Sequence, residues 1–363
     1  MKKFFIAIAA LALVASAACT KTNPEEKKAE KISFQVANYM PQTKAISLIE
    51  DGITSFQCKA FMYGEGVGTE NMQDFFGANG EIITPDNTDD PTEWAPSHEY
   101  YWPKSAKSYI NFFSWYDTGA GPAVTNGTMK WENRVIATGD NIMYADPAWH
   151  FQNNDHSLYN KNQVTKGVPT LFHHALAQVE FRAYATKLSN TDPAVTWTVK
   201  LTDIKIGKIV NKGTLSLTAT EPAATELNTK GEWTGTPAWL ASTAEADKGE
   251  LSPADYTLTE TAAAFLANQS VLPQALAGIN LTFKLDITTN YAAVEGGAGA
   301  ASNHEIIETT VPLTSFGTEA PTAWDLNTKY IYTLKVVPSE NKVLFDPAVE
   351  AAWETVTLAE KKL

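Results

Sequence analysis

Short runs of alternating apolar and polar residues recur along this chain, and Gly, Pro, Asn and Asp separate them. Successive side chains of a β-strand point to opposite faces, so each run predicts a strand with one buried face. Two clear examples are the sets Phe56, Cys58, Ala60, Met62 and Val179, Phe181, Ala183. The alanine-rich stretch 261–269 is the best candidate for a helix. The pattern as a whole predicts an all-β fold built from β-sandwiches.

The length of the chain, 363 residues, exceeds what one hydrophobic core usually serves, so two domains are expected. The polar stretch 160–169, which contains Gly and Pro, lies between two strand-rich halves. It predicts an N-terminal sandwich over residues 45–166 and a C-terminal sandwich over residues 167–340. Polar stretches rich in Gly, Asn, Asp, Glu or Pro predict long loops at 64–99, 118–133 and 219–255.

The beginning of the chain predicts export. Residues 1–18 start with a basic pair and continue as an apolar stretch shorter than the ~20 residues that span a bilayer. This is the pattern of a secretory signal peptide. Small residues before Cys19 predict cleavage between Ala18 and Cys19 and attachment of an outer-membrane lipid to Cys19. The alternative is a plain secreted protein cut after Ala17 or Ala18. Residues 19–31 are polar and predict a flexible tether.

Few residues in the body of the chain point to chemistry. If Cys19 carries the lipid, Cys58 is left alone and no intramolecular disulfide can form. The net charge of −13 argues against a nucleic-acid partner. The segment HEIIE at 304–308 lacks the second His of a zinc motif, and the adjacent His173 and His174 would point to opposite faces of a strand. We therefore expect no enzymatic activity, no metal site and no cofactor.

Aromatic residues crowd the region between positions 94 and 116. Rings exposed on one face could stack on sugar rings, whereas buried rings would fill a sandwich core. A glycan-binding surface requires exposed, coplanar rings, and the candidates for it are Trp94, Tyr100, Tyr101, Trp102 and Trp115.

Both ends of the body hold segments with strand patterns. At the N-terminal side, Ile32, Phe34 and Val36 are expected to point inward, and Ser33, Gln35 and Ala37 outward. A polar stretch follows in which Lys44 is accessible to proteases and Ala45 begins the next apolar run. The C-terminal segment 341–363 carries apolar residues at Val343, Phe345, Val349, Trp353, Val356 and Leu358.

Several stretches together resemble the fimbrillin, or Mfa-like, family of major and minor pilins from Bacteroides-type bacteria. They include YYWP, YINFFSWYD, NIMYAD, TLFHHALAQVEFRAYA, LTDIKIGKIVNKGTLSLT, SVLPQAL, AWDLNTKYIYTLKV and VLFDPAVEAAWE. In order and spacing they cover the chain from about residue 32 to 355. The entry F-x-H-A-L-A and the closing K-Y-x-Y-T-L with F-D-P-A-V-x-x-W are specific when they occur jointly.

The resemblance implies two transthyretin-like β-sandwich domains with Greek-key-type antiparallel sheets. It also implies a lipoprotein that reaches the outer membrane, where a trypsin-like surface protease removes the anchor and the first strand. The removable strand here is 32–44, cut between Lys44 and Ala45. A strand from another pilin subunit, usually from its C-terminal segment, then fills the groove by β-augmentation. The candidate donor is 341–363, and the alternative is an ordinary last strand with a frayed end.

One feature departs from the family pattern. The usual cleavage residue of the family is Arg, but the two arginines of this chain, Arg134 and Arg182, lie far from the N-terminus. Either the protease accepts Lys44, or the protein is not processed. The first hypothesis is therefore a pilus subunit that takes part in cell adhesion. The alternative is a surface-anchored glycan-binding lipoprotein or an adhesive tip or accessory subunit, whose partner is a glycan or protein on a host or bacterial surface.

Overall fold

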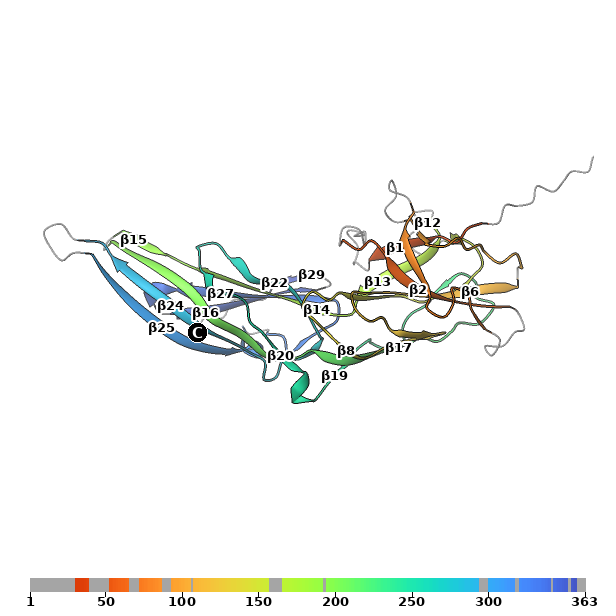
Figure 1. The fold of residues 1–363 in the computed structure, drawn as a ribbon. Helices are drawn as coiled ribbons and strands as arrows, with labels where there is room; N and C mark the ends of the chain where they lie inside the picture. The colour runs from red at the N-terminus through yellow and green to blue at the C-terminus, as the bar shows by residue number, and fades with distance from the viewer. Residues whose placement is uncertain are drawn as a thin grey trace, which may run out of the picture.

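The regular secondary structure of the described residues consists almost entirely of β-strands (Figure 1). The computed structural model describes residues 30–38, 52–64, 72–86, 93–105, 107–156, 165–191, 194–293, 300–316, 320–340, 342–351 and 354–357. Within these residues there is no α-helix, and three short 3-10 turns are present: η2 (Glu245–Asp247), η3 (Leu313–Ser315) and η4 (Pro338–Glu340). Accordingly, no helix in the described part of the chain is long and apolar enough to cross a membrane. The all-β prediction is confirmed.

The first half of the molecule is organised around a ten-stranded sheet that closes on itself. Neighbouring strands follow the circuit β2–β6–β9–β13–β1–β5–β4 and return to β2, because β6 pairs with β2 as well as with β9. The strands of this sheet are β1 (Phe34–Asn38), β2 (Phe56–Gly64), β3 (Gln73–Asp74), β4 (Glu81–Pro85), β5 (Glu93–Pro96), β6 (Ser108–Asp117), β9 (Ile142–Ala145), β10 (Ala148–Phe151), β13 (Val168–His174) and β18 (Thr229–Lys230).

Two hydrophobic clusters lie on the two faces of this closed sheet. Phe34, Phe56 and Phe112 belong to the cluster that fills its interior. Phe113 and Trp131 belong to the second cluster, which joins the outer face of β6 to a four-stranded sheet. That sheet consists of β7 (Ala123–Thr125), β8 (Thr128–Val135), β17 (Lys212–Thr218) and β19 (Trp239–Ala241).

The second half of the molecule consists of two sheets that pack around a third cluster, which includes Phe181, Leu201 and Tyr332. One sheet contains β14 (Ala177–Ala185), β22 (Ala263–Val271), β27 (Thr328–Val337), β28 (Lys342–Ala351) and β29 (Glu354–Thr357). The other contains β15 (Ser189–Thr191), β16 (Ala194–Val210), β20 (Lys248–Leu251), β21 (Tyr256–Thr257), β24 (Asn280–Tyr291) and β25 (Ala301–Pro312). Two small ladders complete the fold: β11 (Asp155–His156) with β12 (Thr165–Lys166), and β23 (Gln274–Ala275) with β26 (Ala323–Trp324).

Some sequence predictions of local structure are wrong. Most of the expected helix at 261–269 belongs to the strand β22. The ladder hydrogen bonds of β22 with β14 outweigh the helix propensity of its alanines. The expected loops at 64–99, 118–133 and 219–255 contain the short strands β3 to β5, β7 and β8, and β18 to β20. Most pairings are antiparallel, but β1 with β13 and β14 with β27 are parallel.

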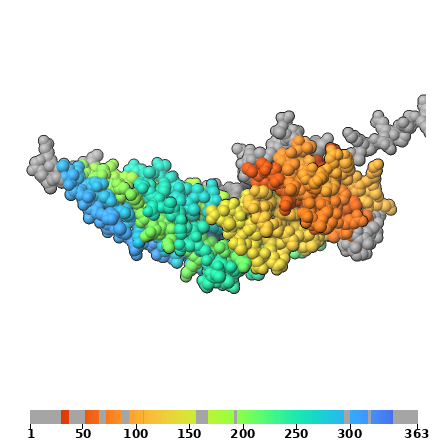
Figure 2. All heavy atoms as spheres, viewed as in Figure 1, coloured from red at the N-terminus to blue at the C-terminus, as the bar shows by residue number. Residues whose placement is uncertain are grey.

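The limits of the two sandwich domains stay a prediction. Residues that follow the expected boundary nevertheless take part in the sheets of the first half: β13 pairs with β9, and β17 pairs with β8. In the space-filling view the first and second halves of the chain follow each other along an elongated molecule (Figure 2).

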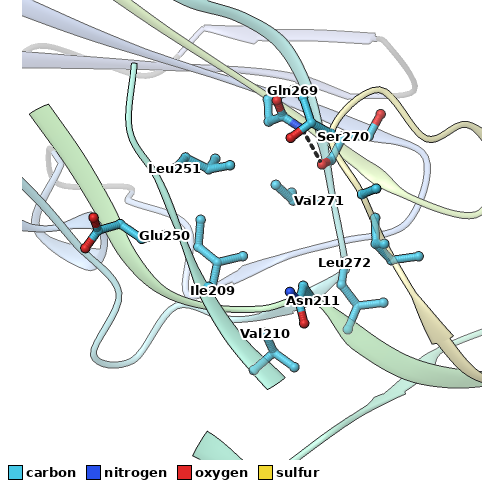
Figure 3. A pocket seen from close by; sticks show the side chains of 13 residues that line it. Ile209, Val210, Asn211, Glu250, Leu251, Gln269, Ser270, Val271 and Leu272 are labelled. Atoms are coloured by element: carbon cyan, nitrogen blue, oxygen red, sulfur yellow. Dashed lines mark hydrogen bonds between the residues drawn. The ribbon is translucent and has the colours of Figure 1, made fainter. Parts of the chain in front are cut away.

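A pocket of about 220 Å³ lies where the ends of β16 and β22 approach β20 and the segment 136–138. Ile209, Leu251 and Val271 supply apolar atoms to it, and Gln269 donates a hydrogen bond to the carbonyl of Ser270 at its rim (Figure 3). This pocket shares no lining residue with the groove of β1 described next.

Candidate functional site

The site to which the sequence directed attention is the first strand, β1, and the groove that holds it. β1 pairs in parallel with β13 over five residues and in antiparallel with the short β5 over two. Among the described residues it is the only strand that connects β13 to β5. Without β1, the circuit of paired strands would therefore be open between these two edges.

The inward side chains of this segment lie in the centre of the first core. Ile32, Phe34 and Val36 are 2%, 0% and 2% exposed, so all three point inward as expected. The Phe34 ring contacts Phe112 and Phe56 edge-to-face, at centroid distances of 5.5 and 6.0 Å. Such contacts add to the free energy of burial. The core of the first half is therefore built around side chains that β1 supplies.

A buried side chain, Asn154, fixes the backbone at the start of β1. Its Oδ1 accepts hydrogen bonds from the Ser33 N–H at 3.2 Å and from the Trp102 indole Nε1–H at 2.9 Å. Its Nδ2 donates to the Lys31 carbonyl at 2.7 Å and to the Glu30 carboxylate at 3.1 Å. Asn154 is 6% exposed, and the oxygen and nitrogen of its buried amide bind the backbone of residues 33 and 31, respectively.

The segment 97–102 forms the other wall of the groove. Its Tyr100 carbonyl accepts the Ile32 N–H at 2.9 Å, and its Trp102 N–H donates to the Glu30 carbonyl at 3.0 Å. The carboxylate of Glu81 holds this segment in place. Burial opposes ionisation of Glu81, but hydrogen bonds led by those from Ser97 and Tyr100 outweigh it and lower its pKa. The wall is therefore fixed by charge-assisted hydrogen bonds.

The beginning of β13 approaches β1 very closely. The Val168 N–H donates to the Ser33 carbonyl at 2.7 Å. Gly167 has φ +105°, and a Cβ atom on it would lie 2.9 Å from the carbonyl carbon and oxygen of Ser33. A side chain at this position is therefore excluded both by the backbone conformation and by β1 itself.

The residues predicted for lipidation and cleavage, Ala18, Cys19, Lys44 and Ala45, lie outside the described part of the chain. Ser33 and Gln35, expected to point outward, are partly buried.

The candidate donor residues lie at the C-terminal end. Val343, Phe345 and Val349 lie on β28 and Val356 lies on β29, where only the backbone is described, and Trp353 and Leu358 lie outside the described residues. The backbone of β28 pairs with β27 over ten residues, and β29 pairs with β28.

The aromatic candidates for a glycan surface do not form one. Trp94, Trp102 and Trp115 are 0%, 6% and 4% exposed, so these three rings fill the core and do not meet the requirement of the glycan-binding alternative. Trp94 lies opposite Phe34 in the ladder of β5 and β1, which directs its ring into the core. Tyr100 is partly buried, and Tyr101 alone of the five is exposed, at 38%.

The two adjacent histidines have separate surroundings, as expected for neighbours in a strand. His173 Nε2 lies 2.9 Å from Asp146 Oδ1, and His174 Nδ1 lies 3.2 Å from Asn141 Oδ1. Burial, assisted by the charge of His173, lowers the pKa of His174 to about 4. The segment 304–308 is part of β25 rather than of a helix.

These features define a structural β-sheet protein in which one N-terminal strand completes the first hydrophobic core. The family model described as fimbrillin-like matches residues 50–351, and the chain belongs to this family. The members of this family are non-enzymatic fimbrial subunits. The chain is therefore a fimbrial protein of the cell surface, and its partners are other pilin subunits.

Many solved structures are similar to this chain, among them two fimbrial proteins. A fimbrial protein from Bacteroides vulgatus has 13% identity and a TM-score of 0.46, and the match covers 88% of this chain and 99% of that one. A fimbrial assembly protein from Parabacteroides distasonis has 10% identity and a TM-score of 0.32, and the match covers 92% of this chain and 99% of that one. The comparison with curated proteins gave no match.

Proposed function

We propose that this protein is a pilus subunit that is exported as a lipoprotein through Cys19, activated by cleavage after Lys44 and polymerised by donor-strand exchange. The observation that carries the proposal is the place of β1 as the link between β13 and β5. Loss of β1 would uncover two strand edges and the apolar groove that holds Ile32, Phe34 and Val36. A strand with the same alternation could restore the ladder and the core together.

The position of Lys44 in the chain supports activation by cleavage. Lys44 lies between Asn38, the last residue of β1, and Phe56, the first residue of β2. A cut after Lys44 would therefore separate β1 from the rest of the fold without breaking a described strand. The peptide released would retain the lipid on Cys19, and the body of the protein would begin at Ala45.

The C-terminal hairpin is the proposed donor. In this structure the backbone of β28 and β29 extends the sheet that contains β27, at the end opposite to β22. Donation requires this hairpin, or β29 alone, to leave that edge and enter the groove of a neighbouring subunit. The alternating positions Val356 and Leu358 or Val343 and Phe345 would then take the places of the inward side chains of β1.

The first test is controlled cleavage of the purified precursor. Trypsin should give an early product that starts at Ala45, and this product should form ladders that resist SDS. Lys44→Ala should abolish both results. Lys31→Ala is the matched control, because Lys31 precedes β1 and its exposed side chain forms a surface ion pair with Glu99. A product that starts at Ala45 and remains monomeric at high concentration would contradict donor-strand exchange.

Two truncations identify the donor. Deletion of residues 352–363 removes β29 and leaves β28 complete, whereas deletion of residues 347–363 also removes half of β28. Loss of ladders from the shorter deletion assigns the donor to β29, and loss from only the longer deletion assigns it to β28. Ladders that persist in both variants would refute a C-terminal donor.

N-terminal analysis of protein recovered from cells decides between the pilin and the anchored alternative. A start at Ala45 supports processing and polymerisation. A lipid-modified start at Cys19 supports an anchored or accessory subunit, as expected if the surface protease accepts Arg only.

A further inference from the structure

One long sheet edge is uncovered in the described part of the chain. β25 ends its sheet and pairs with β24 over twelve residues without a register shift (Figure 1). The other terminal strands of the described sheets hold four residues or fewer, or contain register shifts as β22 does. β25 therefore presents the longest regular backbone edge that no described strand covers, and such edges are templates for another strand.

The two faces of β25 differ in character. The buried β24 residues Leu285 and Ile287 lie opposite Ile307 and Glu305, so the odd-numbered positions of β25 face the core side. The even-numbered positions face outward. Ile306, at the middle of the outward row, is 54% exposed.

A basic residue, His304, and an acidic residue, Glu308, flank Ile306 on the same face. His304 lies two positions before it, with its Nε2 2.8 Å from Asp286 Oδ1 of β24. Glu308 lies two positions after it, with its Oε1 3.8 Å from the Lys284 ammonium. Their side chains are 55% and 78% exposed, so both are accessible from the open side of the edge.

We propose that β25 is an interaction surface for a second copy of this chain, with the two β25 strands antiparallel and centred on Ile306. A twofold axis perpendicular to the sheet then pairs positions that lie equally far before and after 306. Ile306 faces Ile306 of the partner subunit, and His304 faces Glu308 of the partner subunit. The row His-x-Ile-x-Glu is thus complementary to itself, which is the requirement for an isologous interface.

Neighbouring registers that keep the same faces together fit less well. A centre at Glu305 would place two carboxylates against each other, which is destabilising between directly opposed residues. A centre at Ile307 would place Glu308 opposite Ile306 and remove the contacts between His304 and Glu308. The centre at Ile306 also pairs every residue from 301 to 311 with a residue of the partner subunit. Only Pro312, which lacks an N–H, stays outside the ladder.

Site-specific cross-linking tests the register. In a Cys19→Ser background, the remaining Cys58 is fully buried. Position 306 is expected to face its own copy, with Cβ atoms about 5 Å apart. Two copies of position 310 would be separated by eight residues, or about 27 Å at ~3.4 Å per residue. A short bismaleimide should give a covalent dimer with Ile306→Cys and not with Thr310→Cys. Absence of the dimer, or equal yields from both variants, overturns the proposal.

Sedimentation of the precursor tests the energetics without a cross-linker, and it does not depend on strand exchange because the N-terminal strand is intact. Ile306→Lys should weaken the dimer at least tenfold. Leu240→Lys is the matched control, because Leu240 is 77% exposed and lies on the edge strand β19 of the first half. His304→Glu and Glu308→Lys should each weaken the dimer, and the double variant should recover it. Dimerisation that Ile306→Lys leaves unchanged refutes this interface.

Discussion

Phe34→Ala in the precursor tests whether β1 is a separable unit of the first core. The Phe34 side chain is fully buried, and complete burial of such a side chain contributes up to about 3 kcal/mol. Its edge-to-face contacts with Phe56 and Phe112 add about 0.5–1.5 kcal/mol each. The substitution should therefore cost about 4 kcal/mol, within the range of about 3–5 kcal/mol known for Phe→Ala in cores.

The control is Phe61→Ala. Phe61 is also buried, at 4% exposure, and contacts Phe113 at 5.8 Å, but it belongs to the outer cluster and not to the one that contains Phe34. Urea unfolding should show a loss of global stability for both variants. They should differ in native-state hydrogen exchange of β1.

Hydrogen exchange at low denaturant measures the free energy at which β1 opens. If β1 is a separable unit, Phe34→Ala lowers the opening free energy of the Gln35 and Thr170 amides by about 4 kcal/mol, and Phe61→Ala leaves it unchanged. An equal loss of protection in both variants would mean that β1 opens only with the whole fold. That result would refute the reasoning, since a strand that cannot leave alone cannot be exchanged.

Three further outcomes follow from the contacts. Gly167→Ala places a methyl group against Ser33 and should speed formation of ladders by the protein cut after Lys44 at least tenfold; unchanged kinetics would show that the backbone yields without cost. Burial lowers the pKa of His174 to about 4, below its unfolded value of about 6.5, so the unfolded chain gains a proton first. Stability should therefore fall by roughly 2 kcal/mol between pH 6.5 and 4.5, and urea unfolding should show a smaller fall in His174→Gln. Arg134→Ala leaves the Asp117 carboxylate, 1% exposed, without its cation, and should cost about 3–5 kcal/mol in urea unfolding, whereas a loss below about 1 kcal/mol would contradict burial of the pair.

The inward face of β1 could be predicted from sequence because strand periodicity is a local property. Ile32, Phe34 and Val36 alternate with polar or small residues, and the structure buries all three. The partners of β1 could not be predicted, since β13 lies some 130 residues further along the chain and no local signal specifies that register. Asn154, which binds the backbone of residues 31 and 33, was missed for the same reason: the second Asn of the polar run at 152–156 looks like a turn residue.

Local propensity also misled where a sheet edge was available. The alanines at 262–264 favour a helix in isolation, but β22 gains ladder hydrogen bonds to β14 and adopts the strand conformation. Trp94 lies in a region whose composition was compatible with a surface platform or with a core. Its register opposite Phe34 instead places it in the core, so composition indicated the aromatic cluster but not its exposure.

The topology around β1 explains why cleavage should precede exchange in the proposed mechanism. While β1 is continuous with β2 through residues 39–55, it occupies its groove at the effective concentration of a tethered strand, which is of millimolar order. A cut after Lys44 alters no described contact, yet it makes β1 a separate ligand whose occupancy depends on its actual concentration. The contacts it would give up are ladder hydrogen bonds and three apolar side chains, which another alternating strand can supply. A donor tethered to a neighbouring subunit recovers the advantage of proximity, so an uncut precursor should stay unpolymerised even at concentrations where the cut protein forms ladders.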